Sequence, residues 1–146
     1  MRRSSDRSDA PHPVPAARPA DAAPPPIRVF IVDDDGHARL GIRMRLRLEP
    51  DIDVVGESAE CAEAVDAAMA ARPDVIVIDL QCADIDGIAA TRRLRELAPG
   101  CAVVMISMYD GECVRAAAAS AGVSAFVAKH QVDCALLDEI RGAARP

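Results

Sequence analysis

The sequence predicts an α/β domain built around a parallel sheet. From Ile27 onward, short apolar runs alternate with amphipathic segments of helical length. Runs that are apolar at every position are typical of strands covered on both faces, as in parallel sheets. Five pairs of run and segment predict five βα units. Because crossovers between parallel strands are right-handed, the helices are expected on both faces of the sheet.

Each expected helix is separated from the next strand by a residue that stops helices. These residues are Pro50, Pro73, the pair Pro99-Gly100, and Gly122. The expected strands are the apolar runs over 27–32, 52–56, 75–78, 102–106 and 124–128. The expected helices cover 37–48, 60–71, 87–97, 112–121 and 134–144.

The first expected helix shows the clearest two-sided pattern. Asp35 stands where an N-cap belongs. Apolar residues four positions apart predict the buried stripe of this helix: Ala38, Ile42 and Leu46. Arginines with the same spacing are interpreted as a solvated face, with a docking patch for a partner as the alternative: Arg39, Arg43 and Arg47.

Length and composition favour one folded domain. The chain has 146 residues, of which 51% are hydrophobic, enough for one sizeable core but not for two. Residues 1–26 hold seven of the eleven prolines and almost no large apolar side chain. Such a composition cannot offset the entropy lost on folding. We expect a disordered tail over 1–26 and one domain over 27–146.

Charge and hydropathy exclude several kinds of partner. A net charge of -6 argues against nucleic acid as a direct partner, because that binding depends on basic surface. No apolar stretch approaches the roughly 20 residues of a membrane span, and no signal-peptide pattern follows Arg2-Arg3. The five cysteines have no metal-ligand spacing and are interpreted as reduced packing residues. The cytoplasm is the expected compartment, without membrane contact.

Acidic residues follow the first and third expected strands. Asp33 and Asp34 come directly after the first, and Asp79 after the third. The carboxyl ends of parallel strands form the edge where open α/β sheets bind ligands. If the two strands are neighbours, three carboxylates converge there, which is unfavourable unless a proton or a cation intervenes. Mg²⁺ binds one or two carboxylates and leaves positions for phosphoryl oxygens, so the cluster predicts magnesium-dependent phosphate chemistry.

A hydroxyl and an ammonium are expected at the same edge. Lys129, the only lysine beside 16 arginines, follows the fifth strand, and Ser107 follows the fourth. An ammonium is a compact point charge that can meet one phosphoryl oxygen, whereas a guanidinium is a broad planar fork. Ser107 and Lys129 can therefore neutralise phosphoryl oxygens that a metal does not reach. Asp79 is the expected nucleophile, because a carboxylate can form an acyl phosphate.

Five short sequence blocks occur in a characteristic order and spacing. They are IVDD at 31–34, PDIDVVGE at 50–57, RPDVIVIDL at 72–80, DGIAATRRLR at 86–95 and AFVAK at 125–129. With these blocks, residues 27–146 resemble the receiver domain of response regulators, particularly the subfamily attached to helix-turn-helix transcription factors. The resemblance implies a flavodoxin-like, doubly wound, five-stranded parallel sheet of order 2-1-3-4-5. It also implies a signalling domain that catalyses only its own phosphorylation and dephosphorylation.

The resemblance implies a role for each polar residue at the sheet edge. Asp79 would accept phosphate from a sensor histidine kinase or a phosphotransfer protein in a Mg²⁺-dependent reaction. The implied metal ligands are Asp34, Asp79 and the backbone carbonyl of Gln81, with Asp33 acting through water. Ser107 and Lys129 would bind the phosphate. Ser107 and Phe126 would act in switching, and Gln81 and Tyr109 would modulate dephosphorylation.

The expected output is contact with another protein through the fourth helix, the fifth strand and the fifth helix. A phosphorylation-dependent dimer remains open. No helix-turn-helix sequence follows residue 146, so DNA binding is not expected of this chain.

The sequence departs from the family pattern in one loop and at one further residue. Relatives usually show Met-Pro-x-Met-Asp-Gly after the phosphoacceptor, but this chain reads CADIDG at 82–87. The missing proline is expected to loosen the loop that carries the metal-binding carbonyl, and Asp84 adds a negative charge. His130 stands where many receivers have proline.

Three alternatives remain at this point. The chain can be a receiver that has lost phosphorylation and works as a constitutive interaction module. It can be a small Mg²⁺-dependent phosphohydrolase with its nucleophile on the first strand, because Asp33-x-Asp35 fits a D-x-D motif, although Asp79 would then have no role. It can also be a truncated transcription factor.

Overall fold

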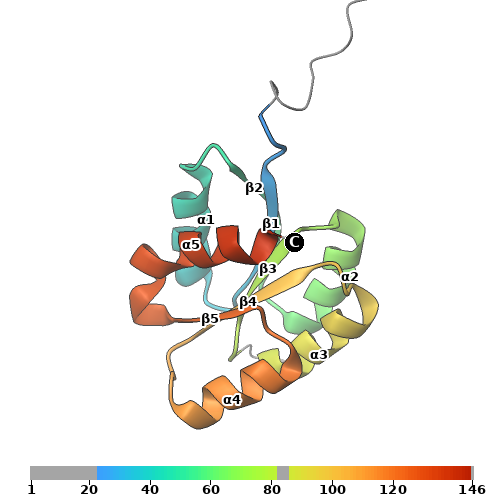
Figure 1. Cartoon of the computed structure of the whole chain (residues 1–146), viewed down its shortest axis with the longest axis vertical. Helices are drawn as coiled ribbons and strands as arrows, with labels where there is room; N and C mark the ends of the chain where they lie inside the picture. The colour runs from blue at the N-terminus through green and yellow to red at the C-terminus, as the bar shows by residue number, and fades with distance from the viewer. Residues whose placement is uncertain (1–22, 82–85, 146) are drawn as a thin grey trace, which may run out of the picture.

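The computed structural model describes residues 23–81 and 86–145. Strands and helices alternate through this part of the chain (Figure 1). They are β1 (Ile27–Val32), α1 (Gly36–Arg47), β2 (Ile52–Ser58), α2 (Cys61–Ala71), β3 (Val75–Asp79), α3 (Gly87–Leu97), β4 (Ala102–Ser107), α4 (Glu112–Ala121), β5 (Ala125–Ala128), the short 3₁₀ turn η1 (Lys129–Gln131) and α5 (Val132–Ala144). The predicted tail, residues 1–26, lies outside the described residues as far as residue 22.

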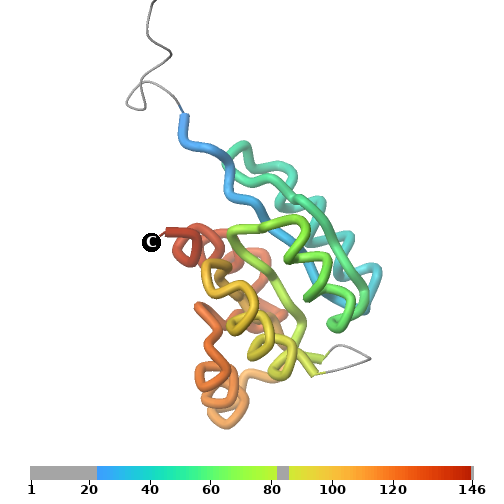
Figure 2. The backbone as a smooth tube through the Cα atoms, turned by 90° about the vertical axis from the view of Figure 1, so that its right-hand side faces the viewer, coloured from blue at the N-terminus to red at the C-terminus, as the bar shows by residue number. Residues whose placement is uncertain are grey.

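The strands form one parallel sheet in the order β2-β1-β3-β4-β5, which confirms the predicted fold class and order. In Figure 2 the blue-to-teal and the orange-to-red parts of the chain lie on opposite sides of the green β3 segment, as this order requires. After β1 the chain adds β2 on one side of β1, and then adds β3, β4 and β5 on the other side, so the strand order reverses between β1 and β3. Such a switch point is where open α/β sheets bind ligands, outside the carboxyl ends of the strands.

The sheet separates two hydrophobic layers. Helices α1 and α5 pack on one face with strand residues such as Ile31 and Val77, and α2, α3 and α4 pack on the other with Phe30 and Ile76. Every residue of β3 is buried. Neighbouring residues of each strand point to opposite faces, which explains why these runs are apolar throughout. Within the described residues, no helix is long and apolar enough to cross a membrane.

Strand β2 extends to Ser58, beyond the predicted end at residue 56. The register against β1 shifts between Val29 and Phe30, so Phe30 pairs with Gly56. A Cβ at position 56 would lie 2.7 Å from the Phe30 ring. Gly56 is therefore a packing residue within the strand, and interpreting it as the strand end was wrong. The extension places Glu57 and Ser58 beside the loop that follows β1.

The helix boundaries agree closely with the predictions, and the N-cap of α1 is confirmed. Asp35 Oδ1 accepts hydrogen bonds from the His37 and Ala38 N–H groups at 2.9 and 3.3 Å. Ile42 and Leu46 form the buried stripe of this helix. Helix α5 begins at Val132, two residues before the predicted start, because η1 leads into it directly.

The cysteines differ from the expectation at one position. Cys61, fully buried at the start of α2, is disulfide-bonded, so the reduced interpretation was wrong for this residue. Sequence spacing could not show this, because a disulfide depends on distance in the fold. Cys101, Cys113 and Cys134 are free. Burial raises the pKa of the Cys101 thiol to about 11, so this side chain behaves as an apolar packing residue.

Candidate functional site

Three carboxylates converge at the carboxyl edge of the sheet. Strands β1 and β3 are neighbours, and Val32 pairs with Ile78, so the residues that follow, Asp33 and Asp79, emerge side by side. Asp33, Asp34 and Asp79 each offer an oxygen within 4.8 Å of the others. Asp33 and Asp79 are buried, and Asp34 is exposed. The structure thus brings together the three residues that the sequence predicted to meet.

Lys129 supplies the positive charge at this cluster. It is the first residue after β5, and its Nζ lies 3.2 Å from Asp79 Oδ2 and 3.3 Å from Asp33 Oδ2. Partial burial disfavours the charged ammonium, but attraction to Asp79 and Asp33 outweighs this and raises the pKa of Lys129 above its ordinary value. The lysine therefore stays protonated and bridges two of the three carboxylates.

The Asp33 carboxylate is the most constrained of the three. Its Oδ1 accepts a hydrogen bond from the Asp35 N–H at 2.9 Å. Its Oδ2 is buried and accepts no hydrogen bond from the described residues, although Lys129 faces it as an ion pair. Burial, reinforced by the nearby Asp79 charge, raises the pKa of Asp33. A buried carboxylate oxygen without a donor, beside two further carboxylates, fits a hard divalent cation such as Mg²⁺.

Ser107 lies at the end of β4, on the same edge. It is fully buried, pairs with Ala128 of β5, and accepts a hydrogen bond from the Tyr109 N–H at its Oγ at 2.9 Å. Because Ala128 immediately precedes Lys129, the hydroxyl and the ammonium come from adjacent strand ends. The predicted placement of both groups at the carboxyl edge is confirmed by this pairing.

Hydrogen bonds hold the described backbone on both sides of residues 82–85. The Gln81 N–H donates to Asp79 Oδ1 at 3.1 Å, and the Gly87 N–H donates to the Leu80 carbonyl at 2.8 Å. A Cβ at position 87 would lie 2.6 Å from the Asp79 carbonyl oxygen, so only glycine lets α3 start this close to the strand. The atypical residues 82–85 between these contacts, Cys82 and Asp84 among them, lie outside the described residues.

Three residues were predicted to act in dephosphorylation or switching: Gln81, Tyr109 and Phe126. Gln81 and Tyr109 border the same open hollow of about 460 Å³, and the Tyr109 side chain is 59% exposed. Phe126 is half-buried on the face covered by α2, α3 and α4. The Arg115 guanidinium lies 4.7 Å from the centre of its ring. His130 is exposed.

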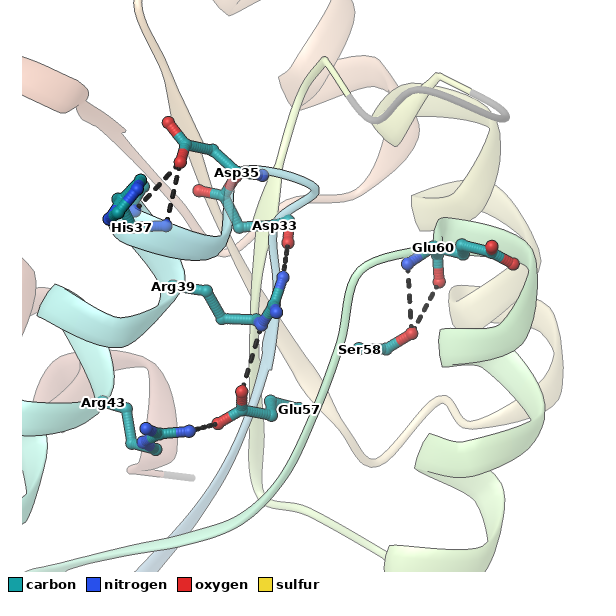
Figure 3. A network of polar contacts seen from close by, with 9 residues as sticks. Asp33, Asp35, His37, Arg39, Arg43, Glu57, Ser58 and Glu60 are labelled. Atoms are coloured by element: carbon teal, nitrogen blue, oxygen red, sulfur yellow. Dashed lines mark hydrogen bonds and ion pairs between the residues drawn. The ribbon is translucent and has the colours of Figure 1, made fainter.

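One polar network was missed by the sequence analysis. Arg39 and Arg43 of α1, interpreted as part of a solvated face, both form ion pairs with Glu57 of β2, at 3.0 and 2.7 Å (Figure 3). The interpretation was wrong for these two residues and holds for the exposed Arg47. The signal in the sequence was Glu57, the last residue of the block PDIDVVGE. Because β2 extends past Gly56, this residue lies within the strand and can reach α1.

The structure argues against a nucleophile on β1. In a D-x-D motif both carboxylates must reach the reacting phosphate, but Asp35 is occupied as the N-cap of α1. Its hydrogen bonds to two backbone N–H groups lower the pKa of its carboxyl group. Asp79, by contrast, lies beside both Lys129 and Asp33.

Comparisons with known proteins agree with this geometry. The profile of the response regulator receiver domain matches residues 29–141. The response regulator VraR of Staphylococcus saprophyticus is 39% identical over 106 residues, which cover 71% of this chain and 50% of VraR. The transcriptional regulator LiaR of Bacillus subtilis is 35% identical over 120 residues, covering 82% of this chain and 56% of LiaR. The chain thus spans about half the length of these two relatives.

Solved receiver structures superpose over most of the chain. The response regulator domain of Thermotoga maritima CheB has a TM-score of 0.76 at 30% identity, covering 83% of this chain and 99% of that domain. The receiver domain of NarL from Mycobacterium tuberculosis has a TM-score of 0.74 at 28% identity, covering 82% of this chain and 99% of that domain. Fold, site geometry and sequence together identify the chain as a member of the response regulator receiver domain family of two-component signalling.

Proposed function

We propose that this protein receives a phosphoryl group on Asp79 from a sensor histidine kinase or a phosphotransfer protein. The observation that carries the proposal is the contact of Lys129 Nζ with Asp79 Oδ2 at 3.2 Å, beside Asp33 and Asp34. Asp79 is a buried carboxylate with a cation and two further carboxylates around it. This is the arrangement expected of a nucleophile that attacks a phosphoryl group beside a bound metal.

Mg²⁺ is the proposed cofactor, held by Asp34, Asp79 and the Gln81 carbonyl, with Asp33 acting through water. When bound, it would draw charge from the phosphoryl oxygens. The chain's own groups do the rest. Asp79 attacks the phosphorus through one carboxylate oxygen, and the bond from phosphorus to the donor nitrogen breaks. Two observations support a role for Ser107 and Lys129 at the phosphoryl oxygens: Ser107 ends β4, which pairs with β3, and the Lys129 ammonium lies 3.2 Å from Asp79 Oδ2.

The proposed output is a change in a protein-binding surface on α4, β5 and α5. Ser107 and Phe126 would transmit the change, because Ser107 ends β4 and Phe126 lies on the neighbouring β5, where it pairs with Met105. A downstream protein in the cytoplasm is the proposed target, and a phosphorylation-dependent dimer is the second form of output. We propose no direct contact with nucleic acid, because the chain carries a net charge of -6.

Mass measurement after incubation with acetyl phosphate tests this function. The whole protein should gain one phosphoryl group when Mg²⁺ is present and none in EDTA, and Asp79→Asn should gain none. Asp35→Asn serves as a matched control, because it removes a nearby carboxylate that is used as a helix cap. Absence of label in the wild-type protein, both with acetyl phosphate and with phosphorylated kinases, would favour the phosphorylation-independent interaction module.

A further inference from the structure

The side chain of Arg39 ties the loop after β1 to strand β2 (Figure 3). Its Nη1 donates to the backbone carbonyl of Asp33 at 2.6 Å, and its Nε donates to Glu57 Oε1 at 3.0 Å. Arg43 donates to the other Glu57 oxygen at 2.7 Å. The side chains of Arg39 and Glu57 are only 21% and 28% exposed, so this network is more restrained than a solvated surface pair.

The carbonyl that Arg39 holds belongs to the peptide joining Asp33 to Asp34. Two further hydrogen bonds fix the same stretch of backbone. The Asp33 N–H donates to the Ser58 carbonyl at 3.1 Å, and the Asp35 N–H donates to Asp33 Oδ1 at 2.9 Å. Because a peptide group is planar, fixing the Asp33 carbonyl also fixes the amide nitrogen of Asp34. The same plane sets the position of the Asp34 Cα, from which its side chain projects.

The Asp34 carboxylate has no comparable support of its own. It is exposed, and no residue in the described ranges, 23–81 and 86–145, donates a hydrogen bond to it or forms an ion pair with it. Asp33 differs, because Lys129 and the Asp35 N–H hold its side chain directly. The position from which Asp34 reaches the cluster therefore depends on the backbone that Arg39 holds.

We propose that Arg39, clamped by Glu57, is a positioning residue that aligns Asp34 for binding a divalent cation. The inference rests on the proposed function, in which Asp34 is a metal ligand. A guanidinium can donate to a carbonyl and to a carboxylate at once in a fixed geometry, which a single ammonium cannot reproduce. Residues that hold metal ligands in place typically change metal affinity by about 10- to 100-fold when they are replaced.

The direction of the change in Mg²⁺ affinity distinguishes a positioning role of Arg39 from a purely electrostatic one. Arg39 carries a positive charge near a proposed cation site, so its removal by electrostatics alone would strengthen Mg²⁺ binding. Positioning requires the opposite result, a weaker site. Arg39→Lys is informative for the same reason, since it keeps the charge and loses the fork.

The test is the Mg²⁺ dissociation constant, measured by isothermal titration calorimetry on the whole protein at fixed ionic strength. Arg39→Ala and Arg39→Lys should each raise the constant by about tenfold, the low end of the range for such residues. Arg47→Ala is the matched control, because it removes the same charge from an exposed position further along the same helix. It should leave the constant within about twofold, as expected for a screened surface charge.

Thermal unfolding without Mg²⁺ supplies the second readout. Lower stability of Arg39→Ala with an unchanged dissociation constant would mean that Arg39 is merely structural, and would overturn the proposal. Wild-type affinity in Arg39→Lys, or tighter binding in Arg39→Ala, would overturn it as well. If Arg39→Ala does not fold, Arg39→Lys and Glu57→Gln carry the test.

The proposed function and this inference fail in different ways. A wild-type protein that binds Mg²⁺ and is labelled on Asp79, with Arg39→Lys equally good at both, contradicts only the role of Arg39. A wild-type protein that binds no Mg²⁺ and accepts no phosphoryl group contradicts the proposed function, and the positioning role falls with it.

Discussion

Replacing Lys129 with methionine removes the cation that bridges Asp33 and Asp79 while keeping a side chain of similar length. At an effective dielectric constant of about 20, the ammonium attracts each of Asp79 and Asp33, at 3.2 and 3.3 Å, by about 5 kcal/mol. Without it, two carboxylates that lie within 4.8 Å repel each other by about 3.5 kcal/mol or more. The desolvation of three charges offsets part of the attraction in the wild-type protein.

Removing one partner from a buried ion pair typically costs about 3–5 kcal/mol. The Lys129 side chain is 21% exposed, so water screens part of the interaction and the low end applies. We expect Lys129→Met to lower the free energy of unfolding in EDTA by about 3 kcal/mol, and Tm by roughly 10 °C for a domain of this size. Mg²⁺ should stabilise the variant more than the wild-type protein, because two uncompensated carboxylates bind a cation more tightly.

The measurement is urea unfolding followed by circular dichroism, in EDTA and in Mg²⁺. Equal stability of the two proteins in EDTA, or a smaller gain from Mg²⁺ in the variant, would refute the reasoning. Lys129→Arg is the companion variant, because it retains the charge. It should lose less stability than Lys129→Met but should not restore the response to phosphorylation, since the guanidinium needs more lateral room than an ammonium.

Three further predictions concern pH, packing and lifetime. Burial and the Asp79 charge raise the pKa of Asp33, so in this pH range the folded state keeps a proton that the unfolded chain releases. The free energy of unfolding without Mg²⁺ should therefore fall as pH rises from 3.8 through the raised pKa. In urea unfolding at a series of pH values, Asp33→Asn should lack that part of the fall. Gly87→Ala should cost about 1–3 kcal/mol of stability through the clash with the Asp79 carbonyl. Gly41→Ala, in open space within α1, should instead stabilise by about 0.5–1 kcal/mol, and equal effects of the two in thermal unfolding would contradict the packing argument. Tyr109→Ala should shorten the half-life of phosphorylated Asp79 severalfold in a radiolabel decay assay, because the ring is expected to obstruct the approach of water. An unchanged or longer half-life would disprove that screening.

The sheet and the convergence of the acidic residues could be predicted because each depends on local pattern and strand direction. The apolar runs mark the strands, and a residue that follows a strand of a parallel sheet must emerge at the carboxyl edge. Asp33, Asp79, Ser107 and Lys129 needed no further information to be placed there. The N-cap at Asp35 is local in the same sense, since a side chain binds N–H groups of the next turn.

The missed features all depend on contacts between distant segments. Glu57 meets Arg39 and Arg43 only because the register between β1 and β2 shifts at Phe30 and lets β2 continue past Gly56. On a helical wheel these arginines lie about 100° from the apolar stripe, but a wheel does not show the neighbouring strand β2. The disulfide of Cys61 is a contact of the same kind, because spacing in the sequence says nothing about distance in the fold.

The contact of Lys129 with both Asp33 and Asp79 affects how the net charge of the site changes when it binds a cation and a phosphoryl group. With all three carboxylates ionised, Asp33, Asp34, Asp79 and Lys129 together carry a charge of -2. One divalent cation would bring this group to neutrality, and conversion of the Asp79 carboxylate into an acyl phosphate with a charge of about -2 would add only about one negative charge. Lys129 can follow the new oxygens by exchanging carboxylate partners for phosphoryl partners. If the proposed function holds, phosphorylation would therefore act mainly by changing which atoms the ammonium binds, and the turn that begins at Lys129 would carry that change.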